Sequence, residues 1–162
     1  MNKRIWLWSD NIRRFLVKKY FFLFALCVIF ALRLFAQTAA ELETILSADA
    51  VTYKQAASLV LQAAEVAASG SAFDYAMEKN WLPATATQDA EAKLDGVSLL
   101  VMQAFNMKGG AFYTLIRTPH YAYRELLYQN IIQGRADSDM AVSGDLLLFI
   151  VNRVLERNEG EL

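Results

Sequence analysis

Few side chains in this 162-residue chain are of the types that carry catalysis, and their spacing matches no reactive site. The single histidine, His120, follows Pro119 at an expected helix start, where a capping or packing role is the usual one. Ser98 and Ser143 also stand at expected helix starts, outside the Gly-x-Ser-x-Gly pattern of a nucleophilic serine. A hydrolase using Glu125 would need a second carboxylate nearby. The sequence therefore predicts no catalytic residue and no enzyme.

The acidic and glycine-rich stretches complete no ligand-binding motif either. Asp137 and Asp139 resemble the opening of a calcium loop, but the glycine and distal glutamate of an EF-hand are absent. Lys108-Gly109-Gly110 lacks the residue order of a phosphate-binding loop and is expected to end a helix. The only cysteine, Cys27, lies in an apolar run near the N-terminus. We therefore expect no metal site and no cofactor.

The stretch 108–134 stands out by its aromatic content. It holds the only histidine, one of two prolines, three of seven glycines and four of seven tyrosines. Tyrosine buries its ring while its hydroxyl reaches water or a partner, so such a cluster is either core or a binding surface. Several of these rings exposed together would mark a surface for a protein partner. The candidate partner-binding residues are Phe112, Tyr113, Tyr121, Tyr123, Arg124 and Tyr128.

Apolar residues recur at helical spacing along the chain, which predicts an all-α fold of about five helices around this stretch. Residues 38–44 are expected to be extended or frayed, 112–116 either strand-like or a single turn, and 156–162 frayed. The first expected helix begins at the capping-box pattern from Thr52 to Gln55 and ends at Ser69-Gly70-Ser71, and the second runs from Ala72 to Asn80. The third starts at Asp95 or Ser98, the fourth runs from Thr118-Pro119 to Ile132, and the last is capped by Ser143.

The N-terminal 36 residues have the composition of an export signal. They carry seven of the 16 Lys and Arg residues but one of the 17 Asp and Glu residues, and include a thirteen-residue apolar run from Tyr20 to Leu32. We expect residues 1–36 to be a signal peptide cleaved near Ala36, or alternatively an uncleaved membrane anchor. Residues 37–162 then form one helical domain, with its core at about 46–155. This domain has a net charge of −7, which disfavours nucleic acid as a partner.

Three of the expected helices resemble one another. The segment from Ser58 to Ala64 can be aligned with that from Ser98 to Ala104 and, more loosely, with that from Asp145 to Val151, at offsets of 40 and 47. Two connectors also match, because each ends in Asn followed by two large apolar residues, Asn80-Trp81-Leu82 and Asn130-Ile131-Ile132. Chance similarity among Ala- and Leu-rich helices is the alternative. Tandem repeats of this length bury their apolar faces against their neighbours.

This unit resembles the S-layer homology family, most clearly from Tyr123 to Gly134 and in the loop from Asp137 to Gly144. The span from Leu46 to Leu155 also resembles the exported helical N-terminal region of spirochaete envelope proteins, some of which continue into an OmpA-like domain. The motifs are Trp81-Leu82-Pro83, the segment from Ser98 to Phe105, Lys108-Gly109-Gly110 and the segment from Tyr121 to Leu126. In place of the Thr-Arg-Ala-Glu-like signature of glycan-binding members, this chain has Val-Ser-Leu-Leu and Gly-Asp-Leu-Leu.

Together these features predict a non-enzymatic helical interaction module of the bacterial envelope, located in the periplasm or tethered to the inner membrane. The expected partner is an envelope protein or a second copy of the chain. The alternative implied by the family resemblance is a module that binds peptidoglycan or another cell-wall glycan. Membrane contact is expected only through residues 1–36, if they are retained.

Overall fold

The computed structural model describes residues 40–134 and 137–160, so the expected signal or anchor segment 1–36 lies outside the described residues. Contacts group residues 43–162 into one compact unit. The described residues confirm the all-α prediction, since they form helices and contain no β-strand. The helices are α2 (Tyr53–Ala63), α3 (Ala72–Glu78), α4 (Leu94–Ala104), α5 (Ala111–Leu115), α6 (Pro119–Tyr128) and α7 (Gly144–Gly160); residues 40–46 are also helical.

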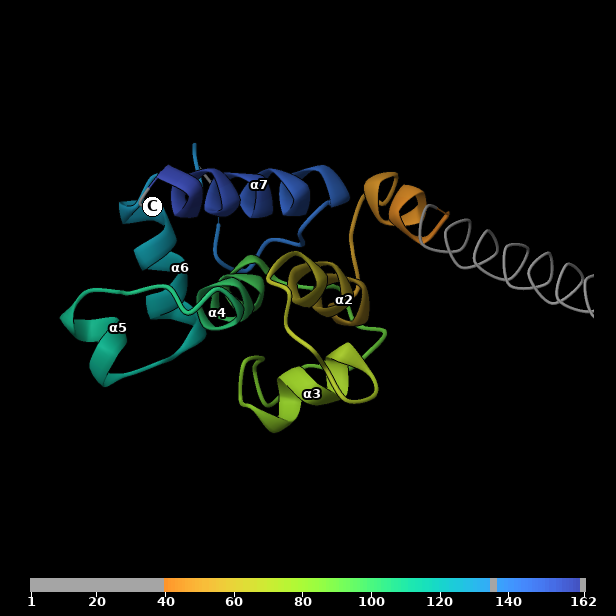
Figure 1. The fold of residues 1–162 in the computed structure, drawn as a ribbon, viewed down its shortest axis with the longest axis horizontal. Helices are drawn as coiled ribbons and strands as arrows, with labels where there is room; N and C mark the ends of the chain where they lie inside the picture. The colour runs from red at the N-terminus through yellow and green to blue at the C-terminus, as the bar shows by residue number, and fades with distance from the viewer. Residues whose placement is uncertain (1–39, 135–136, 161–162) are drawn as a thin grey trace, which may run out of the picture. The chain divides into compact units, whose positions relative to one another are not determined.

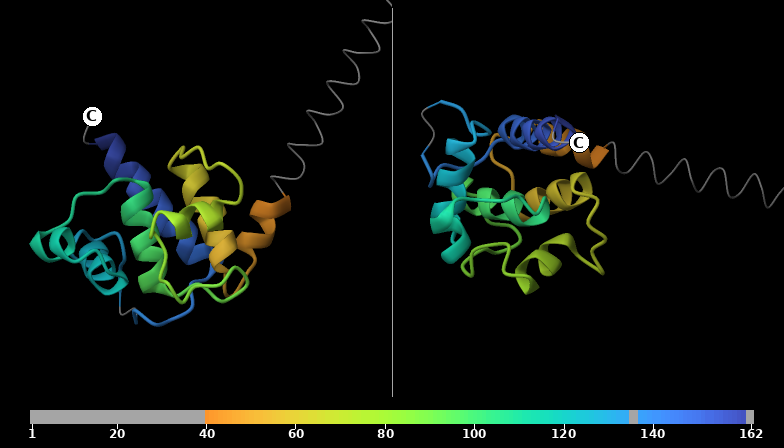
Figure 2. Two further views of the ribbon diagram at one scale, coloured as in Figure 1. Left: turned by 90° about the horizontal axis from the view of Figure 1, so that it is seen from below. Right: turned by 60° about the vertical axis from the view of Figure 1, so that its left-hand side comes forward.

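Helix α4 lies at the centre of the compact unit (Figure 1). It is buried on every side, as its sequence from Val97 to Met102 predicts, in which every residue except Ser98 is apolar. Helices α2 and α6 pack against α4, while α3 and α7 pack against α2 and α5 packs against α6. Figure 2 shows that α5 and α6 lie together at one end of this arrangement. The core therefore holds α6 firmly, and α6 in turn carries α5.

A ring of backbone hydrogen bonds joins the entrances of α2, α4 and α7. We call the segments 48–53, 90–94 and 140–144 the three-segment ring. The Val51 amide donates to Val142 O (2.8 Å), the Val142 amide to Ala92 O (2.9 Å), and the Ala92 amide to Val51 O (2.8 Å). Isolated antiparallel bridges accompany these bonds at Thr52–Glu91 and Lys93–Ala141. Each long helix is therefore entered from a short extended segment that bonds to both of the others.

The ring also fixes which positions correspond in the three long helices. A second cycle of bonds runs from the Tyr53 amide to Ala90 O, from the Leu94 amide to Met140 O and from the Gly144 amide to Ala48 O, at 3.0–3.1 Å. Tyr53, Leu94 and Gly144 are thus equivalent positions. The sequence alignment is therefore out of register by one residue at the offset of 40, between the first two long helices, and by three residues at the offset of 47, between the second and the third. At Gly144 a side chain would meet the carbonyl of Ile45, which explains why this position is glycine.

Four helices end in the same way, on a residue with positive φ. These residues are Glu65, Asn80, Asn106 and Asn130, with φ between 49° and 58°. In each case the next amide bonds back to a carbonyl five residues earlier, as from Trp81 N to Ala76 O (2.8 Å). This is the Schellman arrangement, in which the residue after the left-handed one contacts the helix. The two Asn-plus-apolar connectors noted in the sequence are therefore helix ends.

The second connector is longer than the first. The first runs from Glu65 to Asn80, whereas the second, between the corresponding helix ends, runs from Asn106 to Asn130. The chain from Asn80 to the ring segment 90–94 has the same length as the chain from Asn130 to the ring segment 140–144. The second connector therefore contains nine additional residues: six of them lie between α4 and α6, and the other three make α6 longer than α3. Helix α5 lies in the longer connection between α4 and α6, which we call the insertion.

Several predicted helix limits need correction. Residues 40–46 are helical instead of extended, α5 resolves the undecided stretch as a short helix, and the last helix continues to Gly160 instead of fraying from residue 156. Helix α2 ends at Ala63, before the predicted Ser-Gly-Ser stop. Helix α4 begins at Leu94, and α6 ends at Tyr128 because Asn130 has already left the helical conformation. The capping box at Thr52 and the Ser143 cap are confirmed.

Candidate functional site

The structure divides the six candidate partner-binding residues into two groups. Tyr113 and Tyr123 belong to the core, with 5% and 9% of their surface exposed. Phe112, Arg124 and Tyr128 are exposed, with 70% for Phe112 and 84% for Tyr128. Tyr121 is half-buried and stacks on Phe112, the ring centroids being 5.9 Å apart and nearly parallel. The aromatic stretch thus contributes two rings to the core and leaves others exposed.

The exposed members form a surface with two aliphatic neighbours. Phe112, Leu115 and Ile116 follow one another at helical spacing in and just after α5, and Leu115 is 80% exposed. Phe112 and Tyr128 line one shallow hollow between α5 and α6, of about 190 Å³. We call Phe112, Leu115, Ile116 and Tyr128 the α5–α6 apolar face. Clusters of large, exposed apolar side chains are uncommon on monomeric proteins and commonly mark interaction sites.

Polar side chains of α6 hold the insertion in place. The Glu125 carboxylate accepts a hydrogen bond from the Gly110 amide (2.9 Å), at the residue that precedes α5. Gln129 donates to the Lys108 carbonyl (3.0 Å) and to Glu125 Oε1 (3.0 Å). The carboxylate of Glu125 therefore caps the start of α5. This positioning role is the one that the structure shows for the glutamate considered above as a hydrolase acid.

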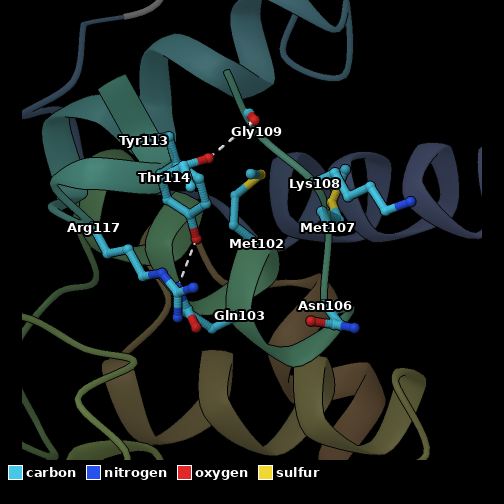
Figure 3. Close-up of a pocket in the computed structure, with 9 residues that line it drawn as sticks. All are labelled: Met102, Gln103, Asn106, Met107, Lys108, Gly109, Tyr113, Thr114 and Arg117. Atoms are coloured by element: carbon cyan, nitrogen blue, oxygen red, sulfur yellow. Dashed lines mark hydrogen bonds between the residues drawn. The ribbon is translucent and has the colours of Figure 1, made fainter. Parts of the chain in front are cut away.

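The buried ring of Tyr113 attaches α5 to α4. Its hydroxyl accepts a hydrogen bond from Gln103 Nε2 at 2.7 Å. Burial raises the pKa of Tyr113, and the hydrogen bond from Gln103 and the charge of Arg117 oppose part of that rise. Tyr113 also lines a second pocket, of about 450 Å³, shown in Figure 3. Tyr113 is therefore a wall shared by two hollows.

The other sequence candidates have structural roles. Ser98 is fully buried in α4, and its hydroxyl donates to the Leu94 carbonyl at 2.6 Å, so it does not cap that helix. His120 is exposed and its ring meets Tyr121 edge to face. Asp139 pairs with Lys93 at 3.2 Å on the surface. Within residues 40–134 and 137–160, no three His, Cys, Asp or Glu side chains are grouped closely enough to hold a metal ion.

Sequence reasoning missed Leu115, Ile116 and Gln103. The first two fall in the stretch left undecided between strand and turn, although their spacing from Phe112 is that of one helix face. Nothing local marks Gln103, because its role depends on a tyrosine ten residues later in another helix. Similarly, the spacing of Tyr121, Arg124 and Tyr128 places them on one face of α6, apart from Tyr123.

Comparisons of the chain with protein-family models, with curated proteins and with solved structures find no significant match. The resemblance to the S-layer homology family therefore stays a prediction. In the part of the chain that the structure describes, no helix has the length and apolar character needed to cross a membrane.

Proposed function

We propose that residues 37–162 form a non-enzymatic protein-interaction module of the bacterial envelope, exported to the periplasm, whose partner binds the α5–α6 apolar face. The observation that supports this proposal is the insertion between α4 and α6. It adds no residue to the ring that joins the long helices, yet it carries Phe112, Leu115 and Ile116 with much of their apolar surface in solvent. Insertions in tandem units commonly form the binding face.

The geometry of the face suits a partner with an apolar segment. Phe112 is supported from behind by Tyr121, and the start of α5 is fixed by Glu125, so these side chains are held before a partner arrives. Prior ordering lowers the entropy lost on binding. Aromatic anchors of this kind carry much of the energy of protein interfaces. The acidic domain surface is compatible with a protein partner and unfavourable for nucleic acid.

Site-specific photo-crosslinking in intact cells tests this proposal. A photoreactive residue at position 115 should give one discrete crosslinked protein, which mass spectrometry identifies. The control places the same residue at Phe149, an exposed aromatic position on α7. Replacing Leu115 and Ile116 by Ser should weaken binding of the identified partner by about tenfold or more, because truncating an interface anchor commonly costs over about 1 kcal/mol. Equal crosslinking at positions 115 and 149 would contradict the proposal.

A second candidate function is cell-wall glycan binding. The three-segment ring, in which Tyr53, Leu94 and Gly144 take equivalent places, supports the repeat hypothesis on which this candidate rests. Sedimentation of the protein with peptidoglycan sacculi tests it directly. Retention in the pellet that survives the Leu115 and Ile116 replacements would favour glycan binding over the apolar face, and protein that stays in the supernatant would count against it.

A further inference from the structure

The pocket on the inner side of the insertion differs in chemistry from the α5–α6 apolar face. Its volume of about 450 Å³ lies within the range of small-molecule sites. Its lining combines the apolar side chains of Met102 and Met107 and the ring of Tyr113 with polar groups; these polar lining residues are Gln103, Asn106, Lys108, Thr114 and Arg117. Apolar walls with a few polar groups are typical of sites for small ligands.

The charge of this lining is opposite to that of the domain. Residues 37–162 carry 16 acidic and nine basic side chains, yet the charged residues that line the pocket, Lys108 and Arg117, are both basic. A neighbouring hollow of about 200 Å³ shares Asn106, Met107 and Lys108 with it and adds a third basic residue, Arg157. This arrangement leaves a local positive potential that favours an anion.

Arg117 supplies the charge inside the pocket itself. It is exposed and forms no ion pair with any residue in 40–134 or 137–160. Figure 3 shows its guanidinium extending toward the end of the pocket occupied by Gln103, whereas the Lys108 amine extends away from the other lining side chains. The guanidinium group is suited to binding carboxylate or phosphate through two hydrogen bonds.

The pocket walls are already fixed without a ligand. Tyr113 is held by its hydrogen bond from Gln103, and Thr114 donates to the Gly109 carbonyl (3.3 Å), as Figure 3 shows. Gly109 is packed so closely against the Tyr113 ring that a side chain at position 109 would collide with it. The glycine therefore allows the ring to stand as a wall between the pocket and the α5–α6 apolar face.

We propose that this pocket binds a small hydroxyl-rich molecule bearing one carboxylate or phosphate group. Arg117 binds the anionic group, the amides of Gln103 and Asn106 bind hydroxyl groups, and the Tyr113 ring and the two methionines contact the apolar faces. Only Tyr113 lines both this pocket and the hollow behind the apolar face. The inference is therefore independent of the proposed protein partner.

Titration of the full-length protein in detergent with three matched sugars tests this proposal. The probes are glucuronate, glucose 6-phosphate and glucose, which share one ring and differ in charge. We expect at least one of the acids to bind about tenfold or more tightly than glucose, because the charge-assisted bond to arginine is the strongest contact available. The preferred acid identifies whether carboxylate or phosphate fits. Measurement is by calorimetry or by amide shifts of residues 102–117.

Variants then locate the site. Arg117→Gln should weaken binding of the preferred acid about tenfold or more and leave glucose unaffected, whereas Asn106→Gly, which removes the amide and tolerates the positive φ at this helix end, should weaken both. Lys54→Gln, which removes an exposed positive charge outside the pocket, should change neither. Equal affinity for glucose and the acids, unchanged acid binding in Arg117→Gln, or no binding of either acid at millimolar concentration would each overturn the proposal.

Discussion

At the scale of single residues, Asp95 shows how burial and position oppose each other. It lies in the first turn of α4, where a carboxylate interacts favourably with the helix dipole, and it accepts a hydrogen bond from the Gly96 amide at 2.6 Å. Burial nevertheless raises the pKa of Asp95 above its ordinary value of 3.8, and the nearby Asp139 adds to the rise. The folded protein therefore binds this proton more tightly than the unfolded chain does.

A replacement that removes the charge should accordingly have a pH-dependent effect on stability. Because the pKa of Asp95 is raised by folding, its contribution to the free energy of unfolding falls as pH rises from about 3.8 through the raised value. Asp95→Asn keeps the acceptor oxygen and removes this penalty. We expect the variant to gain stability relative to the original protein at pH 7 but not at pH 3.

Urea unfolding at the two pH values measures this difference. Asp145→Asn is the matched control, because Asp145 occupies the same place in the first turn of α7 with an exposed side chain. A difference between the Asp95 variant and the original protein that is the same at pH 3 and pH 7 would refute the assignment of the penalty to ionised Asp95.

At the scale of helices, the ends show what could be predicted from sequence and what could not. The Thr52–Gln55 box and the Ser143 cap act through neighbouring residues, so local patterns predicted them correctly. The start of α4 has no side-chain cap, and the bond from the Leu94 amide to Met140 O places it instead. Such a tertiary contact leaves no local signal. The same limit applies to α5, whose position depends on Glu125 and Gln129 of another helix.

The residue with positive φ at the end of α2 offers a test of the shared helix ending. Asn occupies this conformation at the other three ends, but here it is held by Glu65, a residue type that tolerates it poorly. Glycine adopts a positive φ without that cost. Glu65→Gly should therefore raise the free energy of unfolding by about 1 kcal/mol.

Glu65→Ala provides the control for this prediction. It removes the same exposed carboxylate but keeps a β-carbon, so it should give no such gain. Urea denaturation curves of the three proteins make the comparison. A gain for alanine as large as that for glycine would show that the charge, and not the backbone conformation, limits stability at this position.

At the scale of the whole compact unit, the insertion contributes to two different surfaces, the α5–α6 apolar face and the basic pocket. The three-segment ring joins the long helices that support this insertion. The basic pocket and the hollow beside the apolar face share only Tyr113 among their lining residues, and both depend on the additional residues between α4 and α6. None of the ring segments lies in the insertion. Changes in the insertion can thus alter these two surfaces without changing how the three long helices are connected.

This separation predicts a distinct pattern of hydrogen exchange in the full-length protein. The amides of Val51, Ala92 and Val142 each bond to a different segment of the ring, and their side chains are almost completely buried. Opening one bond requires the segments to part, which breaks the other two. We expect all three amides to exchange only through global unfolding, with the same free energy that urea denaturation gives.

The Thr114 amide is the internal comparison, because it bonds within the exposed α5 segment, to Gly110 O at 3.0 Å. It should exchange much faster than the ring amides, through local opening of the insertion that leaves the long helices folded. Exchange followed by NMR at several low urea concentrations distinguishes the two modes, since only global opening depends steeply on urea. If one ring amide exchanged with a markedly smaller free energy than the other two, the three units would open separately, and the ring would not be the element that makes them a single cooperative structure.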